Sequence, residues 1–307
     1  MKFIAVLLLA LVCIAPQIEA RSLNGFDLDD ASVPPEKILR GGPPRDGIPA
    51  LDAPEFAPAD ASGLAASTHV LGLSHQGVAR AYPIGILNWH EIVNDRFGDA
   101  PIAVTFCPLC GSGIAFIARI DGEPLSFGVS GLLYQSDLLM YDRNSESLFS
   151  QIGGEAITGK QKGKKLATIA VTHTTLGAWL ERHPQSLVLQ KPREYRRDYE
   201  RDPYLGYAQR PDTYFPVEFR ARGLHPKERV LGHVINGEAR AWPFIALRRV
   251  DSPLADQLGG ETVRVFYDEE SDTARLENEQ GEQLAATTLF WFAWSAFHPD
   301  TSLFSTK

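Results

Sequence analysis

The sequence predicts a β-dominated α+β protein with few short helices, built as two related halves by an internal duplication. Three observations predict this. The 307 residues are 44% hydrophobic and 22% charged, which is an ordinary globular composition. Many segments are apolar and β-branched and are broken by Gly and Ser, as strands and turns are. A segment also recurs at a constant spacing of 160 residues, which indicates a repeated unit.

Residues 1–20 are predicted to be a secretory signal peptide that lies outside the fold. Lys2 precedes an apolar run from Phe3 to Ile14, and Ala20 supplies a small residue at the expected cleavage point. The run is too short for a membrane span, and no later segment is long and apolar enough to be one. We therefore expect an exported protein, periplasmic or extracellular, with no transmembrane segment after processing.

The duplication organises the mature chain. Residues 21–65 are rich in Pro, Ala and Asp and are predicted to form an extended N-terminal arm on the surface. Residues 70–87 (VLGLSHQGVARAYPIGIL) and 230–247 (VLGHVINGEARAWPFIAL) share nine identical residues in eighteen positions. Each copy reads as a strand, a glycine-containing turn and a second strand. We place the first half at 66–190 and a second, degenerate half at 227–307.

Two short helices are predicted near the end of the two halves. Thr174 and Thr287 each open a segment that contains a tryptophan and stops at His-Pro, at His183 and His298. A threonine in this position can cap the start of a helix. The tryptophans and the His-Pro stops of the two segments are 115 residues apart, so the first half holds about 45 more residues between its landmarks.

A tyrosine-rich connector at 191–226 joins the halves and carries five of the nine tyrosines. We expect these rings to pack on the domains. The alternative is that the connector roofs a cleft between them.

The candidate chemistry lies in the first half, at a Cys-Pro-Leu-Cys-Gly run. Loss of Cys13 with the signal peptide leaves Cys107 and Cys110 as the only cysteines, directly after an apolar strand-like segment. At the 160-residue spacing the second half has Tyr267 to Glu270 instead, so the pair is absent there. Gly111 tolerates a positive φ angle, which is typical of metal-binding turns.

The first hypothesis is a metal site. Cys107 and Cys110 would be ligands, with His90 the third and Met140 a possible fourth. Two thiolates, an imidazole and a thioether suit copper, which we favour slightly, whereas two thiolates and an imidazole with an open position suit zinc. The competing interpretation of His90 and Met140 is that both belong to the core.

Two further hypotheses remain open. The pair could be a thiol–disulfide redox centre, although the glycines after Cys110 disfavour the helix that a thioredoxin site requires. The protein could also be a non-catalytic binding or scaffold module in which a disulfide staples a turn. Enzymatic activity is not decided by these patterns.

Charged residues of the first half supply catalytic candidates. Asp137, Asp142 and Arg143 could line the cysteine site as acid–base or supporting groups. The simpler interpretation of Asp142-Arg143-Asn144 is a turn. The sequence contains no glycine-rich nucleotide loop, Gly-x-Ser-x-Gly elbow or His-Glu-x-x-His helix. A formal net charge of -8 argues against nucleic acid as a partner, which leaves a small molecule or a protein of unknown identity.

Several separated motifs resemble one family of exported bacterial proteins, the domain of unknown function 3179. They are Asn88-Trp89-His90-Glu91, the Cys107–Gly111 run, the segment 127–149 (FGVSGLLYQSDLLMYDRNSESLF) and parts of the connector. The resemblance covers most of the mature chain. It implies export and places the cysteine run among the family's characteristic positions, and it implies no catalytic residues.

Overall fold

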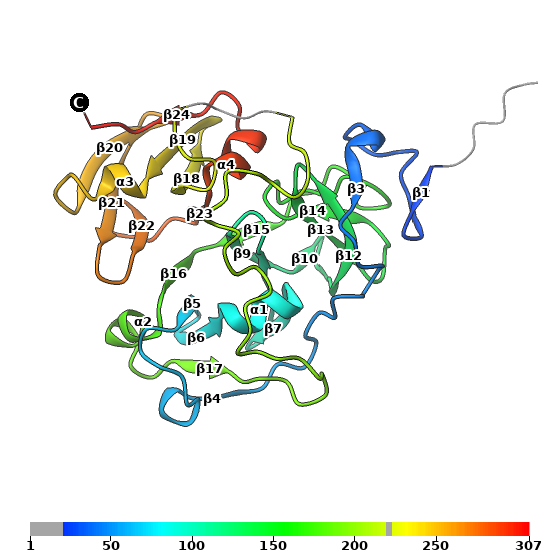
Figure 1. The fold of residues 1–307 in the computed structure, drawn as a ribbon, viewed down its shortest axis with the longest axis horizontal. Coiled ribbons are helices and arrows are strands. Elements are labelled where there is room, and N and C mark those ends of the chain that lie inside the picture. The colour runs from blue at the N-terminus through cyan, green and yellow to red at the C-terminus, as the bar shows by residue number, and fades with distance from the viewer. Residues whose placement is uncertain (1–20, 219–222, 307) are drawn as a thin grey trace, which may run out of the picture.

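The computed structural model describes residues 21–218 and 223–306, so the predicted signal peptide lies outside the described residues. The described residues form a five-bladed β-propeller, made mostly of strands with four short α-helices (Figure 1). The expectation of an α+β fold in two related halves was therefore wrong. The helices span only four to seven residues each, too few to form a layer of their own.

The first two blades are formed by strands that lie between residues 56 and 189. One is a five-stranded sheet whose order is β16 (Val171–Thr175), β5 (His69–His75), β6 (Val78–Pro83), β17 (Leu187–Leu189) and β4 (Phe56–Pro58). The next is an antiparallel sheet in the order β15 (Ala167–Ile169), β9 (Ser112–Ile117), β8 (Ala100–Cys107) and β7 (Ile92–Phe97).

A third blade joins the N-terminal residues to the middle of the chain. Its order is β14 (Leu148–Ser150), β13 (Asp137–Asp142), β12 (Phe127–Tyr134) and β3 (Ile38–Arg40). The predicted arm at 21–65 thus contributes β3 and β4 to two separate blades. Two small hairpins stand beside the blades: β1 (Ser22–Leu23) with β2 (Phe26–Asp27), and β10 (Arg119–Ile120) with β11 (Glu123–Pro124).

The last two blades come from the C-terminal part of the chain. Their orders are β23 (Thr287–Phe290), β18 (Arg229–Ile235), β19 (Glu238–Pro243) and β24 (Ser302–Leu303), and β20 (Leu254–Leu258), β21 (Glu261–Asp268) and β22 (Thr273–Asn278). The α-helices are α1 (Ile84–His90), α2 (Leu176–Arg182), α3 (Phe244–Leu247) and α4 (Trp291–Phe297), and the 3₁₀ turns are Pro35–Lys37 and Ala59–Ala61.

The repeated sequence encodes one hairpin in each of two blades, β5–β6 and β18–β19. Its glycines have a packing reason. A Cβ atom on Gly72 would lie 2.2 Å from Trp179 Cε3, and one on Gly232 would lie 2.4 Å from Trp294 Cε3. The repeated sequence therefore predicts a local hairpin with a tryptophan ring packed over its glycine. It does not fix the number of sheets, since the extra residues of the middle segment build the β12–β14 blade.

The two predicted short helices form where the sequence places them, as α2 and α4. The side chain of Thr175 caps α2 by accepting a hydrogen bond from the Ala178 amide at 3.3 Å. Helix α4 begins after Phe290 instead and has no side-chain cap.

Candidate metal centre

Cys107 and Cys110 lie at the two ends of a tight turn between adjacent antiparallel strands. Cys107 is the last residue of β8 and pairs with Ser112, the first residue of β9. Gly111 closes the turn with a φ of +61°, and a Cβ atom there would lie 3.1 Å from the Phe290 ring. Only glycine fits both conditions without strain, so the turn holds both thiols on one side of the strand ends.

A second turn, from the neighbouring blade, brings Asp137 to the thiols. Gln135 and Ser136 connect β12 to β13 and have φ angles of 54° and 66°. Two left-handed residues match the type I′ hairpin turn, which glycine and asparagine normally occupy, so this turn holds local strain. The Ser136 carbonyl oxygen accepts from the Cys110 thiol at 3.4 Å.

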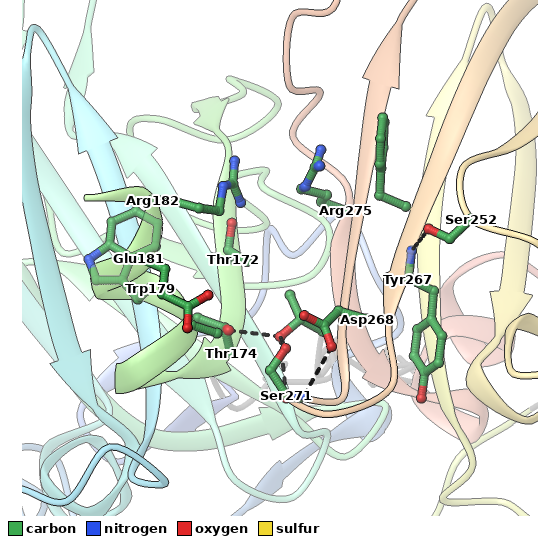
Figure 2. Close-up of a pocket in the computed structure, with 13 residues that line it drawn as sticks. Thr172, Thr174, Trp179, Glu181, Arg182, Ser252, Tyr267, Asp268, Ser271 and Arg275 are labelled. Atoms are coloured by element: carbon green, nitrogen blue, oxygen red, sulfur yellow. Dashed lines mark hydrogen bonds between the residues drawn. The ribbon is translucent and has the colours of Figure 1, made fainter. Parts of the chain in front are cut away.

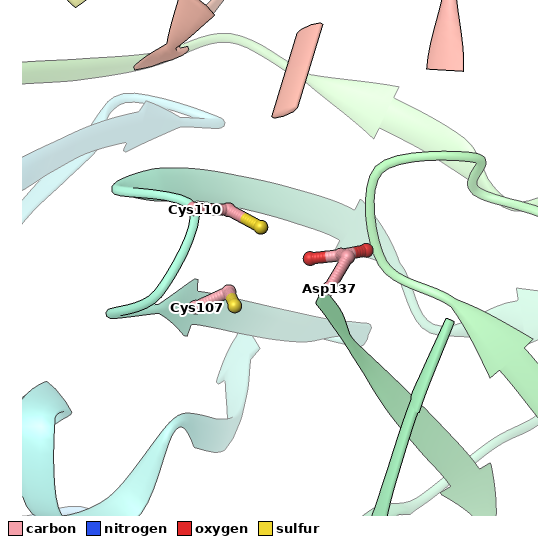
Figure 3. A group of neighbouring side chains, drawn as sticks. All are labelled: Cys107, Cys110 and Asp137. Atoms are coloured by element: carbon pink, nitrogen blue, oxygen red, sulfur yellow. The ribbon is translucent and has the colours of Figure 1, made fainter. Parts of the chain in front are cut away.

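Cys107, Cys110 and Asp137 form a group whose donor atoms all lie within 4.8 Å of one another (Figure 3). Their exposed fractions are 2%, 0% and 0%. Asp137 Oδ2 accepts from the Ile152 amide at 2.9 Å, whereas Oδ1 is buried with no well-formed hydrogen bond. Figure 3 shows one carboxylate oxygen directed toward the two sulfur atoms. The site thus offers a buried oxygen and two free thiols to a shared space.

The electrostatics of this group favour its neutral form while no cation is bound. Burial raises the pKa of Asp137 to about 7. Burial also raises the pKa of both thiols, and the nearby Asp137 carboxyl raises them further. A bound metal ion would reverse this preference, because it stabilises thiolate and carboxylate together.

Glu91 is a second carboxyl group at the site. It follows α1 with a φ of 57°, and its carbonyl oxygen accepts from the Phe106 amide at 2.7 Å. The residue is 8% exposed, and burial together with the charge of Asp137 raises its pKa to about 8. We did not predict Glu91 from the sequence; the available signal was an acidic residue directly before the apolar pair Ile92-Val93.

The tyrosine-rich connector covers this region. Tyr207 is buried, and its ring centroid lies 6.5 Å from that of Phe290, whose amide donates to the Cys110 carbonyl at 2.8 Å. Burial raises the pKa of Tyr204, and the nearby Glu91 and Cys107 raise it further. Two of the five connector tyrosines therefore lie beside the cysteine site.

The other two ligands predicted from the sequence lie elsewhere. His90 Nδ1 lies 2.8 Å from the Pro49 carbonyl oxygen and Nε2 lies 2.7 Å from the Tyr199 hydroxyl, so both ring nitrogens are engaged. Met140 is fully buried in β13 opposite Phe149, three residues from Asp137, which is about 10 Å along a strand. His90 is therefore not a member of the Cys107–Cys110–Asp137 group. Met140 lies in the hydrophobic cluster that also contains Cys107 and Cys110.

Asp142 and Arg143 lie at the far end of β13. Asp142 Oδ2 accepts from the Ser145 amide at 2.8 Å, which is the role of a turn residue. Arg143 forms an ion pair with Asp52 at 2.7 Å. Of the three charged candidates, Asp137 alone is in the cysteine group.

Comparison with known proteins gives one match. A family profile described as a protein of unknown function, DUF3179, matches residues 45–287. No curated protein and no solved structure matches the chain. Within the described residues, no helix combines the length and apolar character that crossing a membrane requires.

Proposed function

We propose that this chain, which belongs to the DUF3179 family of proteins of unknown function, binds one zinc ion through Cys107, Cys110 and Asp137. The observation that carries the proposal is the convergence of two buried thiols and a buried, incompletely bonded carboxylate oxygen within 4.8 Å. Two sulfur ligands on one zinc ion lie at most about 4.6 Å apart, since each Zn–S bond is about 2.3 Å. A small inward movement of the three side chains would therefore bring their donor atoms to the distances that a zinc ion requires.

The donor set favours zinc over copper. Copper was preferred on the basis of a thioether from Met140, and the residue that stands beside the thiols is the carboxylate of Asp137. Thiolates with a carboxylate oxygen are typical zinc ligands, whereas the oxygen is a poor ligand for Cu(I). Three protein ligands leave a fourth position open. After burial and Asp137, the Glu91 carboxyl group also raises the pKa of Cys107, so it lies near this site.

The structure gives less support to a thiol–disulfide redox centre. Such a centre needs an accessible sulfur atom and a stabilised thiolate. Cys107 and Cys110 are 2% and 0% exposed, and burial raises the pKa of both thiols. A zinc ion would also protect this pair from oxidation in the exported location that residues 1–20 predict.

Zinc titration of the reduced, metal-free chain tests the proposal. We expect one zinc ion per chain, measured by competition with a chromophoric chelator. Cys107→Ser, Cys110→Ser and Asp137→Asn should each weaken zinc binding by at least tenfold, which is 1.4 kcal/mol. In the same titration with copper(I), Asp137→Asn should weaken copper binding less than it weakens zinc binding.

Two control variants make the titration decisive. Met140→Leu and Asp52→Asn should keep zinc affinity. Met140 is three residues from Asp137 in β13, so its side chain points to the opposite face of the strand, and Asp52 pairs with Arg143. Absence of zinc binding in the folded, reduced wild type would reject the proposal. So would a loss in Met140→Leu as large as the loss in Asp137→Asn.

A further inference from the structure

A second candidate site lies in a polar cleft between two blades, apart from the cysteine group. One wall is β16 with α2 and the other is β21 with β22 (Figure 2). The cavity holds about 220 Å³, which equals roughly seven water molecules at about 30 Å³ each. This size suits a small molecule.

One end of the cleft is positively charged. Figure 2 shows Arg182 and Thr172 on one wall, with Arg275 facing Arg182 from the other wall. Among the described residues, the Arg182 guanidinium has neither a hydrogen bond nor an ion pair. Burial and the charge of Arg275 lower the pKa of Arg182, so the two cations repel each other across the gap.

The carboxylate that acts on this end, Glu277, already pairs with arginines other than Arg182. Glu277 pairs with Arg275 and also lies 3.4 Å from Arg264. Its single negative charge therefore meets three arginines, counting its longer-range effect on Arg182. This local excess of positive charge stands out on a chain whose net charge is -8.

The positive end is also shaped for a planar anion. The Arg275 side chain is 21% exposed, and its guanidinium stacks on the Phe266 ring at 3.7 Å. The Thr172 hydroxyl accepts from Gln283 at 3.0 Å, which leaves its own proton available to donate. Two guanidinium groups and a hydroxyl are the donors that bind a carboxylate.

The other end of the cleft is negatively charged. Glu181 and Asp268 face each other there, from α2 and from the end of β21 (Figure 2). Asp268 is held in place because its Oδ1 accepts from the Glu270 amide at 2.9 Å. These two exposed carboxylates attract a cation and disfavour a second anionic group at this end.

We propose that this cleft binds a small amino-acid zwitterion. Its carboxylate lies between Arg182 and Arg275, near Thr172, and its ammonium group lies between Glu181 and Asp268. One bound molecule then supplies a negative charge to the arginine pair and a positive charge to the carboxylate pair. Dianions are disfavoured, because their second charge would meet the acidic end.

Calorimetric titration at low ionic strength tests this inference, with glycine and L-alanine as probes and acetate and malonate as comparisons. We expect one amino acid per chain, bound at least tenfold more tightly than acetate or malonate. Arg182→Gln should weaken glycine binding at least tenfold. Glu181→Gln should weaken glycine binding and leave acetate binding unchanged or stronger.

Arg249→Gln is the matched control, since it removes an exposed arginine outside the cleft. It should bind glycine like the wild type. The inference is overturned if neither amino acid binds the folded wild type, if malonate binds as tightly as glycine, or if Arg182→Gln and Arg249→Gln behave alike. None of these results depends on zinc.

Discussion

Asp137→Asn should have opposite effects on stability without and with zinc. In the metal-free protein Asp137 Oδ1 is buried and incompletely bonded, and an unsatisfied buried group costs about 1–3 kcal/mol. Asparagine keeps the oxygen that accepts from Ile152 and places an amide donor beside the sulfur atoms. We therefore expect the metal-free variant to be more stable than the wild type.

The magnitude follows from ordinary unfolding thermodynamics. A change of 1 kcal/mol shifts the melting temperature by about 2–4 °C for a chain of roughly this size. The metal-free variant should thus melt a few degrees above the wild type. Zinc at a hundred times its dissociation constant should stabilise the wild type by about 2.7 kcal/mol, which reverses the order.

Differential scanning calorimetry under reducing conditions, with a chelator or with zinc, measures both effects. Asp52→Asn, which changes a carboxylate in an ion pair near the surface, is the control for loss of charge. The reasoning is refuted if the metal-free Asp137→Asn variant melts below the wild type. It is equally refuted if zinc raises the melting temperature of both proteins by the same amount.

Three further predictions concern the fold, its response to pH and its processing. Gly72→Ala should destabilise the protein by about 1–3 kcal/mol in urea unfolding, because the added methyl group meets Trp179. Gly85→Ala should be nearly neutral, and equal effects of the two substitutions would contradict the packing argument. Burial lowers the pKa of His298 to about 4, so the unfolded chain binds more protons between pH 4 and 6.5 and stability falls as the pH drops through this range. Partial exposure limits the loss to about 2–3 kcal/mol, and His298→Gln should flatten the dependence of unfolding free energy on pH; an unchanged slope would exclude this residue as the cause. Amino-terminal sequencing of exported protein should begin near Arg21, and a mature chain that retains residues 1–20 would contradict the predicted signal peptide.

The sequence predicted local features better than it predicted the arrangement of sheets. The apolar strand before Cys107 and the glycine after Cys110 are local signals, and the turn they predicted is present. The hairpin repeat is also a local signal. It does not encode how hairpins are grouped into blades, because β3 and β4 reach their blades from distant parts of the chain.

The candidate site was only partly predictable for the same reason. Cys107 and Cys110 are close in sequence, but Asp137 reaches them through a turn between two strands of another blade. The sequence presents Asp137 as one of three charged candidates, and nothing in its local pattern separates it from Asp142. His90 was attractive as a ligand by residue type, and its ring nitrogens bond to Pro49 and to the connector, contacts that only the tertiary structure reveals.

X-ray absorption at the zinc edge of the zinc-loaded protein tests the central claim most directly, because it reports the ligand atoms themselves. The account predicts two sulfur neighbours at about 2.3 Å and one or two oxygen neighbours at about 2.0–2.2 Å, with one sulfur lost in Cys107→Ser. An imidazole scattering pattern, a zinc ion with no sulfur neighbour, or a spectrum unchanged in Cys107→Ser would contradict it.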